Sequence, residues 1–226
     1  MTLLISQLSL NLQHRKVRRD LGNAYDLHRT LSRAFADGPE AAIKPFLWRL
    51  ETSRPLEPPK VLVQSAAEPL WDQLPAGYLL NLADRAWSPE TVLQRGRAVR
   101  LRVLANPTVC RVPTASPEKP SPEGPARGQR KRLGLWREEE QLEWMQRQAQ
   151  RLGLAEVQAE VSRSERWRCR RRGGAITVAV AQFDGQAVIA DPAALAAGVR
   201  AGIGHARMLG LGLVSVAPLG HAPAGA

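Results

Sequence analysis

A short segment near the start of the chain carries side chains that can do acid–base chemistry. Residues 23–35 predict one helix, because Asn23 is a good N-cap and Asp26 adds a favourable charge to the first turn. At roughly 100° per residue, one face of this helix combines a phenol, an imidazole and a hydroxyl, from Tyr25, His28 and Ser32. Another face, suited to packing on a sheet, is apolar and consists of Leu27, Leu31 and Ala34.

Two guanidinium groups, from Arg29 and Arg33, flank the polar face of this helix. An imidazole and a phenol beside guanidinium groups suit proton transfer on an anionic substrate. A single histidine on a helix is also commonly a solvated or capping residue, so the helix alone leaves both interpretations open.

The charge of the whole chain favours a polyanionic partner. The 226 residues include 32 Lys and Arg against 21 Asp and Glu, which gives a net charge of +11 and a pI near 10.9. Most of the excess is arginine, whose planar fork binds phosphate through two hydrogen bonds. Nucleic acid is the first expectation, and an anionic membrane surface is the second.

Several classes of protein are disfavoured by what the sequence lacks. Cys110 and Cys169 are too few for a disulfide scaffold and show no CxxC spacing, which favours a reducing compartment. The N-terminus resembles no signal peptide, and no run of eighteen apolar residues occurs, so a soluble, cytoplasmic protein is expected.

The histidines and acids show no spacing typical of a metal site, so we expect neither a bound metal nor another cofactor. This disfavours two-metal nucleases. Cleavage of a phosphodiester would then need acid–base help from side chains, as when a ribose 2′-hydroxyl attacks its own phosphate. An imidazole with a pKa of ~6.5 suits that work and contributes on the order of 10²–10⁴ in rate.

Hydrophobic periodicity predicts two similar successions of elements. In the first half it predicts strand, helix, strand, strand and helix, with a poorly marked last strand, at residues 3–12, 23–35, 46–51, 60–64, 68–84 and 85–92. A basic loop is expected just before the helix that carries His28, and it is either a solvated loop or part of the site.

The second half repeats this order more clearly. Strands are expected at 97–104, 157–172, 175–189 and 212–218, with helices at 138–152 and from Asp191, and a mobile Pro-rich loop at 113–130. The two successions correspond to an α+β protein of two tandem ferredoxin-like βαββαβ domains, at residues 1–93 and 97–226.

The turn between the two long strands is strongly basic. Between residues 163 and 172, six arginines face one glutamate: Arg163, Arg166, Arg168, Arg170, Arg171 and Arg172. A projecting basic hairpin can follow a phosphate backbone, so this segment predicts contact with RNA or DNA. An ordinary solvated turn is the alternative.

A glycine-rich segment precedes the last strand. Its glycines permit close backbone approach to a phosphate, with Arg207 as a further donor; they are Gly202, Gly204, Gly210 and Gly212. The segment is neither a Walker loop nor a dinucleotide-binding GxGxxG. A helix C-cap and close packing of helix on strand explain the same glycines equally well.

Five stretches together resemble the CasE family, the CRISPR RNA-processing endoribonucleases of type I-E systems. They follow one another along nearly the whole chain and read RDLGNAYDLHRTLSR from Arg19, FLWRL from Phe46, VLVQS from Val61, LRVLANP from Leu101 and GIGHARMLGLGLVSVAP from Gly202. The resemblance implies a tandem ferredoxin-like fold and a metal-independent nuclease that cuts repeat RNA at the base of its stem-loop. It also implies 5′-hydroxyl and 2′,3′-cyclic phosphate ends, and retention of the enzyme on its product as a subunit of Cascade.

The same resemblance assigns roles to individual residues. It places the catalytic pair on Tyr25 and His28, and a basic residue one helical turn further on Arg33. The basic hairpin is expected to hold the RNA stem, and the glycine-rich segment, with Ser215 in the strand that follows, to line the cleavage site. The expected partners are the CRISPR repeat RNA stem-loop and other Cascade subunits, without a small-molecule cofactor or a membrane.

A non-catalytic RNA-binding scaffold on the same fold is the main alternative to a nuclease. A scaffold would need only the basic surfaces, whereas the shared face of Tyr25 and His28 favours an enzyme. A membrane-surface protein would need a basic amphipathic helix, and no such helix is evident.

Overall fold

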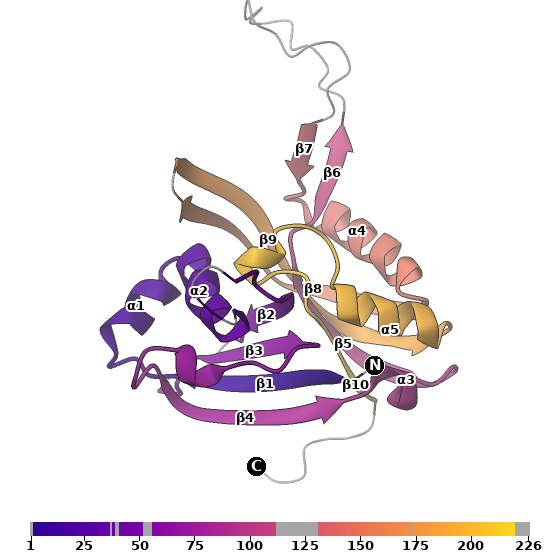
Figure 1. The fold of residues 1–226 in the computed structure, drawn as a ribbon. Helices are drawn as coiled ribbons and strands as arrows, with labels where there is room; N and C mark the ends of the chain where they lie inside the picture. Colours follow the sequence, from indigo (N-terminus) through magenta and orange to yellow (C-terminus); the bar gives the residue numbers. More distant parts are fainter. Residues whose placement is uncertain are drawn as a thin grey trace, which may run out of the picture.

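The structure is a computed structural model that describes residues 2–36, 38, 41–51, 56–111, 131–171 and 173–219. Two four-stranded antiparallel sheets with packed helices form the body of the molecule, and a two-stranded ribbon stands apart from them (Figure 1). None of the helices in these ranges has the length and apolar content needed to span a bilayer.

The first sheet has the strand order β2-β3-β1-β4, with strands β1 (Leu3–Leu10), β2 (Phe46–Leu50), β3 (Lys60–Ser65) and β4 (Leu79–Trp87). Between β1 and β2 the chain forms α1 (Arg15–Leu21), α2 (Ala24–Leu31) and the 3-10 turn η1 (Ser32–Phe35). A second 3-10 turn, η2 (Trp71–Gln73), precedes β4, and the short helix α3 (Pro89–Val92) follows it. The apolar face of α2 packs on the sheet, as its periodicity predicted, and Leu27, Leu31 and Ala34 are all buried.

The second sheet repeats the order as β10-β5-β9-β8, with strands β5 (Ala98–Ala105), β8 (Leu154–Arg171), β9 (Gly174–Ile189) and β10 (Val214–Pro218). Its helices are α4 (Glu138–Arg151) and α5 (Pro192–Ala201). The side chain of Asp191 caps α5 by accepting from the amides of Ala193 and Ala194. Both sheets therefore have the strand order of a ferredoxin-like domain, and the predicted fold class is confirmed.

Three details of the first half differ from the prediction. The expected basic loop before α2 is the helix α1, which begins where the His14 imidazole accepts from the Lys16 amide. The weak helix expected at 68–84 is wrong: Pro75 and Gly77 confine it to η2, and the edge strand β4 begins at Leu79. The last strand, expected at 85–92, is β4: it begins earlier and ends at Trp87, because Pro89 starts α3 there.

The second half also contains elements that the periodicity did not predict. A ribbon of β6 (Thr108–Arg111) and β7 (Lys131–Gly134) extends β5 away from the body of the molecule (Figure 1). The Pro-rich loop predicted at 113–130 lies outside the described residues. Strand β9 runs from Gly174 through Asp184 and Gly185 to Ile189, close to the expected range of 175–189.

The two halves meet around a small third core. Leu104, Cys169 and Leu209 are buried there, and Tyr25 of α2 packs against this cluster. The long β8–β9 hairpin therefore extends from the second sheet toward the helices of the first (Figure 1). A helix of one half is thus in direct contact with a hairpin of the other.

Candidate active site

The polar face of α2 opens into a cavity of ≈ 850 Å³. Its walls include five side chains of α2 and η1, which are Tyr25, His28, Arg29, Ser32 and Arg33. Met208, from the glycine-rich segment, lines the cavity as well. The structure thus brings together the two predicted catalytic residues and both predicted flanking arginines at one cavity.

Aromatic side chains hold the His28 imidazole in place. The ring stacks on Phe46 with centroids 5.1 Å apart and planes 19° from parallel, and its Nδ1 accepts from Trp48 Nε1 at 3.3 Å. Burial lowers the pKa of His28 below its ordinary value, so the imidazole is neutral near pH 7. The other ring nitrogen, Nε2, has no hydrogen-bond partner in the described part of the chain.

The remaining polar side chains of this face differ in their partners and in their exposure to solvent. The Ser32 hydroxyl donates to the His28 carbonyl at 2.8 Å, so its hydrogen bond is used within the helix. Arg29 lies 3.6 Å from Asp26 and is largely exposed. Arg33 is exposed and lines the cavity. Both guanidinium groups can therefore reach an anion in the cavity.

Asn23 occupies the N-cap position of α2 but makes no capping hydrogen bond to the helix, contrary to the prediction. Its side chain turns to the hairpin instead, where Nδ2 donates to the Arg170 carbonyl at 3.0 Å and Oδ1 accepts from the Arg170 amide at 3.3 Å. Nδ2 also donates to Asp26 at 2.9 Å. Asn23 therefore connects the helix of Tyr25 and His28 to the basic hairpin.

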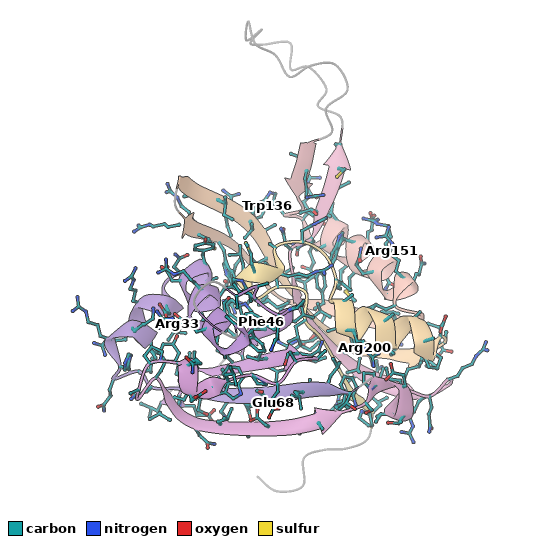
Figure 2. All side chains as sticks on the ribbon, in the orientation of Figure 1. Arg33, Phe46, Glu68, Trp136, Arg151 and Arg200 are labelled. Atoms are coloured by element: carbon teal, nitrogen blue, oxygen red, sulfur yellow. The ribbon has the colours of Figure 1, made fainter. Side chains whose placement is uncertain are left out.

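The arginines of β8 have different environments. Arg163 forms a two-pronged pair with Glu165 at 2.6 and 2.7 Å, so its charge is already neutralised. The Arg166 guanidinium lies 4.5 Å from the centre of the Trp136 ring, and Trp136 itself lies beside the hairpin (Figure 2). Arg168 and Arg170 are exposed. Arg171 belongs to β8, but its side chain, like the whole of Arg172, lies outside what the structure describes.

A second, smaller cavity of ≈ 300 Å³ separates the hairpin from the α1–α2 turn. Asn23 lines one side of it, and Arg163, Arg166 and Arg168 line the other. The hairpin arginines therefore line a cavity at the N-terminal end of α2, and its described lining residues differ from those of the cavity at His28.

The glycine-rich segment is used for close packing at each of its glycines. A side chain at Gly202 would meet Leu47, one at Gly204 would meet Trp144, and one at Gly212 would clash with the Ile203 carbonyl. At Gly210, whose φ is +78°, a Cβ would lie 2.7 Å from the Trp48 ring. The packing explanation of these glycines is therefore the one that the geometry favours, while Arg207 remains exposed.

Ser215 is not in the cavity with His28. Its hydroxyl accepts from Arg49 at 3.0 Å, and it lines a separate cleft of ≈ 320 Å³ between the two sheets. Ser215 thus takes part in the contact between the two halves, and its expected place at the cleavage site stays a prediction.

Three functional features were missed in the sequence. The partners of His28, Phe46 and Trp48, lie on β2, and the Asn23–Arg170 link joins positions 147 residues apart. The alternation of a strand places Phe46 and Trp48 on the same face of β2, and this could have been predicted from the sequence. That α2 packs on this face could not, because no local pattern indicates it. Among the described residues, no group of three or more His, Cys, Asp or Glu side chains is arranged to hold a metal.

Comparison with known proteins identifies the family of this chain. A family model described as CRISPR associated protein matches residues 3–218. The chain is 33% identical over 226 residues to the CRISPR-associated endoribonuclease Cse3 of Thermus thermophilus, covering 95% of this chain and 99% of that protein. It is 31% identical over 202 residues to the Cascade subunit CasE of Escherichia coli, covering 89% and 94% of the two chains.

Solved structures give the same result. The structure of Thermus thermophilus Cse3 bound to an RNA representing a pre-cleavage complex matches with a TM-score of 0.79 and 34% identity, over 96% of this chain and 100% of that one. The chain therefore belongs to the family of CRISPR-associated proteins that includes Cse3 and CasE.

Proposed function

We propose that this protein is an endoribonuclease that cleaves CRISPR repeat RNA at the base of its stem-loop without a metal ion. The observation that carries the proposal is that Tyr25, His28, Arg29 and Arg33 line one cavity. A relative that is 33% identical is named an endoribonuclease, and a solved relative was bound to a pre-cleavage RNA. A scaffold that only bound RNA would have no use for a buried neutral imidazole beside a phenol.

The proposed reaction is an internal transfer of the phosphodiester. The 2′-oxygen bonds to phosphorus while the bond from phosphorus to the 5′-oxygen breaks, so the 2′-hydroxyl loses a proton and the leaving oxygen gains one. The products are a 2′,3′-cyclic phosphate and a 5′-hydroxyl. Tyr25 and His28 serve the proton movements and the charge on the phosphate, and Arg29 and Arg33 add cationic stabilisation.

The basic hairpin is proposed to hold the stem of the RNA. Arg168 and Arg170 are exposed and free to contact phosphates, and Asn23 fixes their strand relative to α2. A relative that is 31% identical is a Cascade subunit, and on this basis the protein is proposed to stay on its product within that complex. Two unpaired cysteines fit a reducing compartment, and the cytoplasm is the proposed site of action.

Cleavage of the cognate repeat RNA in excess EDTA tests the proposal. Wild-type protein is expected to cut, and a folded His28→Ala variant that still binds RNA is expected to lose about 10²-fold or more in rate. Equal cutting by both proteins would exclude His28 as a catalytic residue. Cutting that appears only after metal is added would exclude the metal-independent mechanism.

A substrate with a 2′-deoxy sugar at the cut site tests the nucleophile. It should bind like the normal RNA and resist cleavage, because the attacking oxygen is absent. Efficient cleavage of this substrate would exclude 2′-hydroxyl attack. If neither substrate is cut under any condition while both bind tightly, the protein is a scaffold instead of an enzyme.

A further inference from the structure

The hydrogen bond between Trp48 and His28 determines which nitrogen of the neutral imidazole carries the proton. The indole N–H of tryptophan can only donate, so the nitrogen that it approaches, His28 Nδ1 at 3.3 Å, must present a lone pair. A neutral imidazole has one N–H and one acceptor nitrogen. Nε2 therefore carries the proton.

Stacking limits the other orientations of the ring. Phe46 lies against the face of the imidazole, and Phe35 lies against Phe46 with centroids 4.2 Å apart and planes 10° from parallel. If the His28 ring turned over, a carbon would face Trp48 Nε1 and leave a buried N–H without a partner. An unpaired buried donor costs about 1–3 kcal/mol, which favours the observed orientation.

Trp48 is itself held from both halves of the molecule. It lies on β2, its side chain is only 2% exposed, and Gly210 of the second half packs directly on its ring. A Cβ at position 210 would lie 2.7 Å from that ring. The absence of a side chain at Gly210 therefore allows the indole to sit where it can reach His28.

We infer that Trp48 is a positioning residue that holds His28 as the neutral Nε2–H tautomer, so that the imidazole acts as a hydrogen-bond donor to the phosphate in the cavity. The inference rests on the proposed function for its substrate, an RNA phosphodiester. Protonation of Nδ1 would place two N–H groups against each other, so the indole opposes the imidazolium form. In this role His28 stabilises the developing negative charge and does not start as the base that takes the 2′-hydroxyl proton.

The tautomer can be measured without any activity. In nitrogen NMR of the wild-type protein with labelled histidines, near neutral pH, the His28 signals are assigned by their loss in a His28→Gln variant. Nδ1 is expected to be unprotonated and Nε2 protonated. A proton on Nδ1, or rapid exchange between the two tautomers, overturns the inference whether or not the protein cuts RNA.

Substitution of the indole gives the functional arm of the test. Trp48→Phe keeps an aromatic ring but removes the donor, so the single-turnover cleavage rate should fall about 10–100-fold while the Kd for RNA changes less than about twofold. The preference for Nε2–H should weaken in the same variant. An unchanged rate together with an unchanged tautomer would overturn the inference.

Trp71→Phe is the matched control. Trp71 packs edge-on against Phe35 of the same aromatic stack at 5.8 Å, and its buried Nε1 has no hydrogen-bond partner among the described residues. Its replacement removes an indole N–H nearby without touching His28, so cleavage and tautomer should match the wild type. If the wild type shows the Nε2–H tautomer but cuts no RNA, the proposed function fails while the positioning of His28 by Trp48 stands.

Discussion

At the scale of single residues, Asp20 is a fully buried carboxylate that connects three elements of the first half. It accepts from Thr30 of α2 at 2.6 Å and from Tyr78, just before β4, at 2.9 Å, and Lys16 Nζ lies 3.3 Å away. Burial, and then the charge of Asp20, raise the pKa of the Tyr78 hydroxyl, so this group remains a donor at any ordinary pH.

Replacement of Asp20 should be costly. Asp20→Ala leaves two buried hydroxyls and an ammonium without their partner, and should lower the free energy of unfolding by about 3 kcal/mol. Urea denaturation measures this change. Asp84→Ala, on the exposed strand β4, is the control and should stay within about 0.5 kcal/mol of the wild type. A similar loss in both variants would contradict the role given to Asp20.

A pH dependence follows from the burial of His28, which lowers the pKa of the imidazole below 6.5. Below about pH 6.5 the unfolded chain takes up a proton at His28, and the folded chain takes it up only at a lower pH. Between these two pKa values this residue makes the free energy of unfolding fall as the pH falls. The penalty is fully developed below the folded pKa and absent above the unfolded one.

The His28→Asn variant should lack this contribution. The difference in unfolding free energy between variant and wild type should therefore move in favour of the variant as the pH falls from about 8 to about 5. Denaturation curves at several pH values measure it. A difference that stays constant over this range would mean that His28 is not desolvated in the folded protein.

At the scale of elements, the β8–β9 hairpin presents free guanidinium groups only at some positions. Arg163 is paired with Glu165, whereas Arg168 and Arg170 are exposed. Arg168→Gln with Arg170→Gln should weaken RNA binding and reduce the slope of log affinity against log salt by about 0.7 to 0.9 for each lost contact. Binding measured at several salt concentrations gives this slope.

A pair of arginines on α4 provides the control for this charge effect. Arg147→Gln with Arg151→Gln removes the same charge, and Arg151 lies at the end of α4 away from the hairpin (Figure 2). Affinity and slope should remain close to wild-type values in the control. Equal effects in the two double variants would indicate a response to net charge alone, and would remove the hairpin as the RNA contact.

At the scale of the whole molecule, Arg49 joins the two halves. Its buried guanidinium donates to the carbonyls of Arg102 and Leu213 at 3.3 Å and to the Ser215 hydroxyl at 3.0 Å, while Glu51 of its own half neutralises it at 2.6 Å. Burial lowers the pKa of Arg49, and the nearby Glu51 raises it in opposition. A buried charge with this set of partners fixes the relative position of the two sheets.

Arg49→Met should therefore weaken the contact between the two halves and destabilise the protein. The variant keeps an unbranched apolar side chain but removes the nearest cation from Glu51, which among the described residues retains only Arg102 at 3.9 Å, and should lower the free energy of unfolding by about 3 kcal/mol. Lys60→Met, which removes an exposed partner 3.6 Å from Glu57, should cost less than about 1 kcal/mol. Calorimetry or urea denaturation compares them, and equal losses would contradict a joining role for Arg49.

The sequence predicts an element correctly where the element depends on residues close to one another in the chain. The alternation in β1, the cap of α5 at Asp191 and the apolar face of α2 follow directly from spacing, and each is present. The edge strand β4 was expected too late in the chain, at 85–92, because most of its residues are exposed and its apolar residues mark no buried face. Asn23 does occupy the N-cap position, but its side chain bonds Arg170, which is remote in sequence, so a tertiary contact replaced the expected capping hydrogen bond.

The packing of Gly210 against the Trp48 ring limits how the two halves of related proteins can be exchanged in chimeras. Trp48 belongs to the first half and Gly210 to the second, and both lie behind His28. Consider a chimera that keeps the first half of this protein and takes the second half from a relative. It would retain His28 and Trp48, but a residue larger than glycine at position 210 would displace the indole that orients the histidine. The two halves therefore have to be exchanged together, although each has the complete strand order of a ferredoxin-like domain.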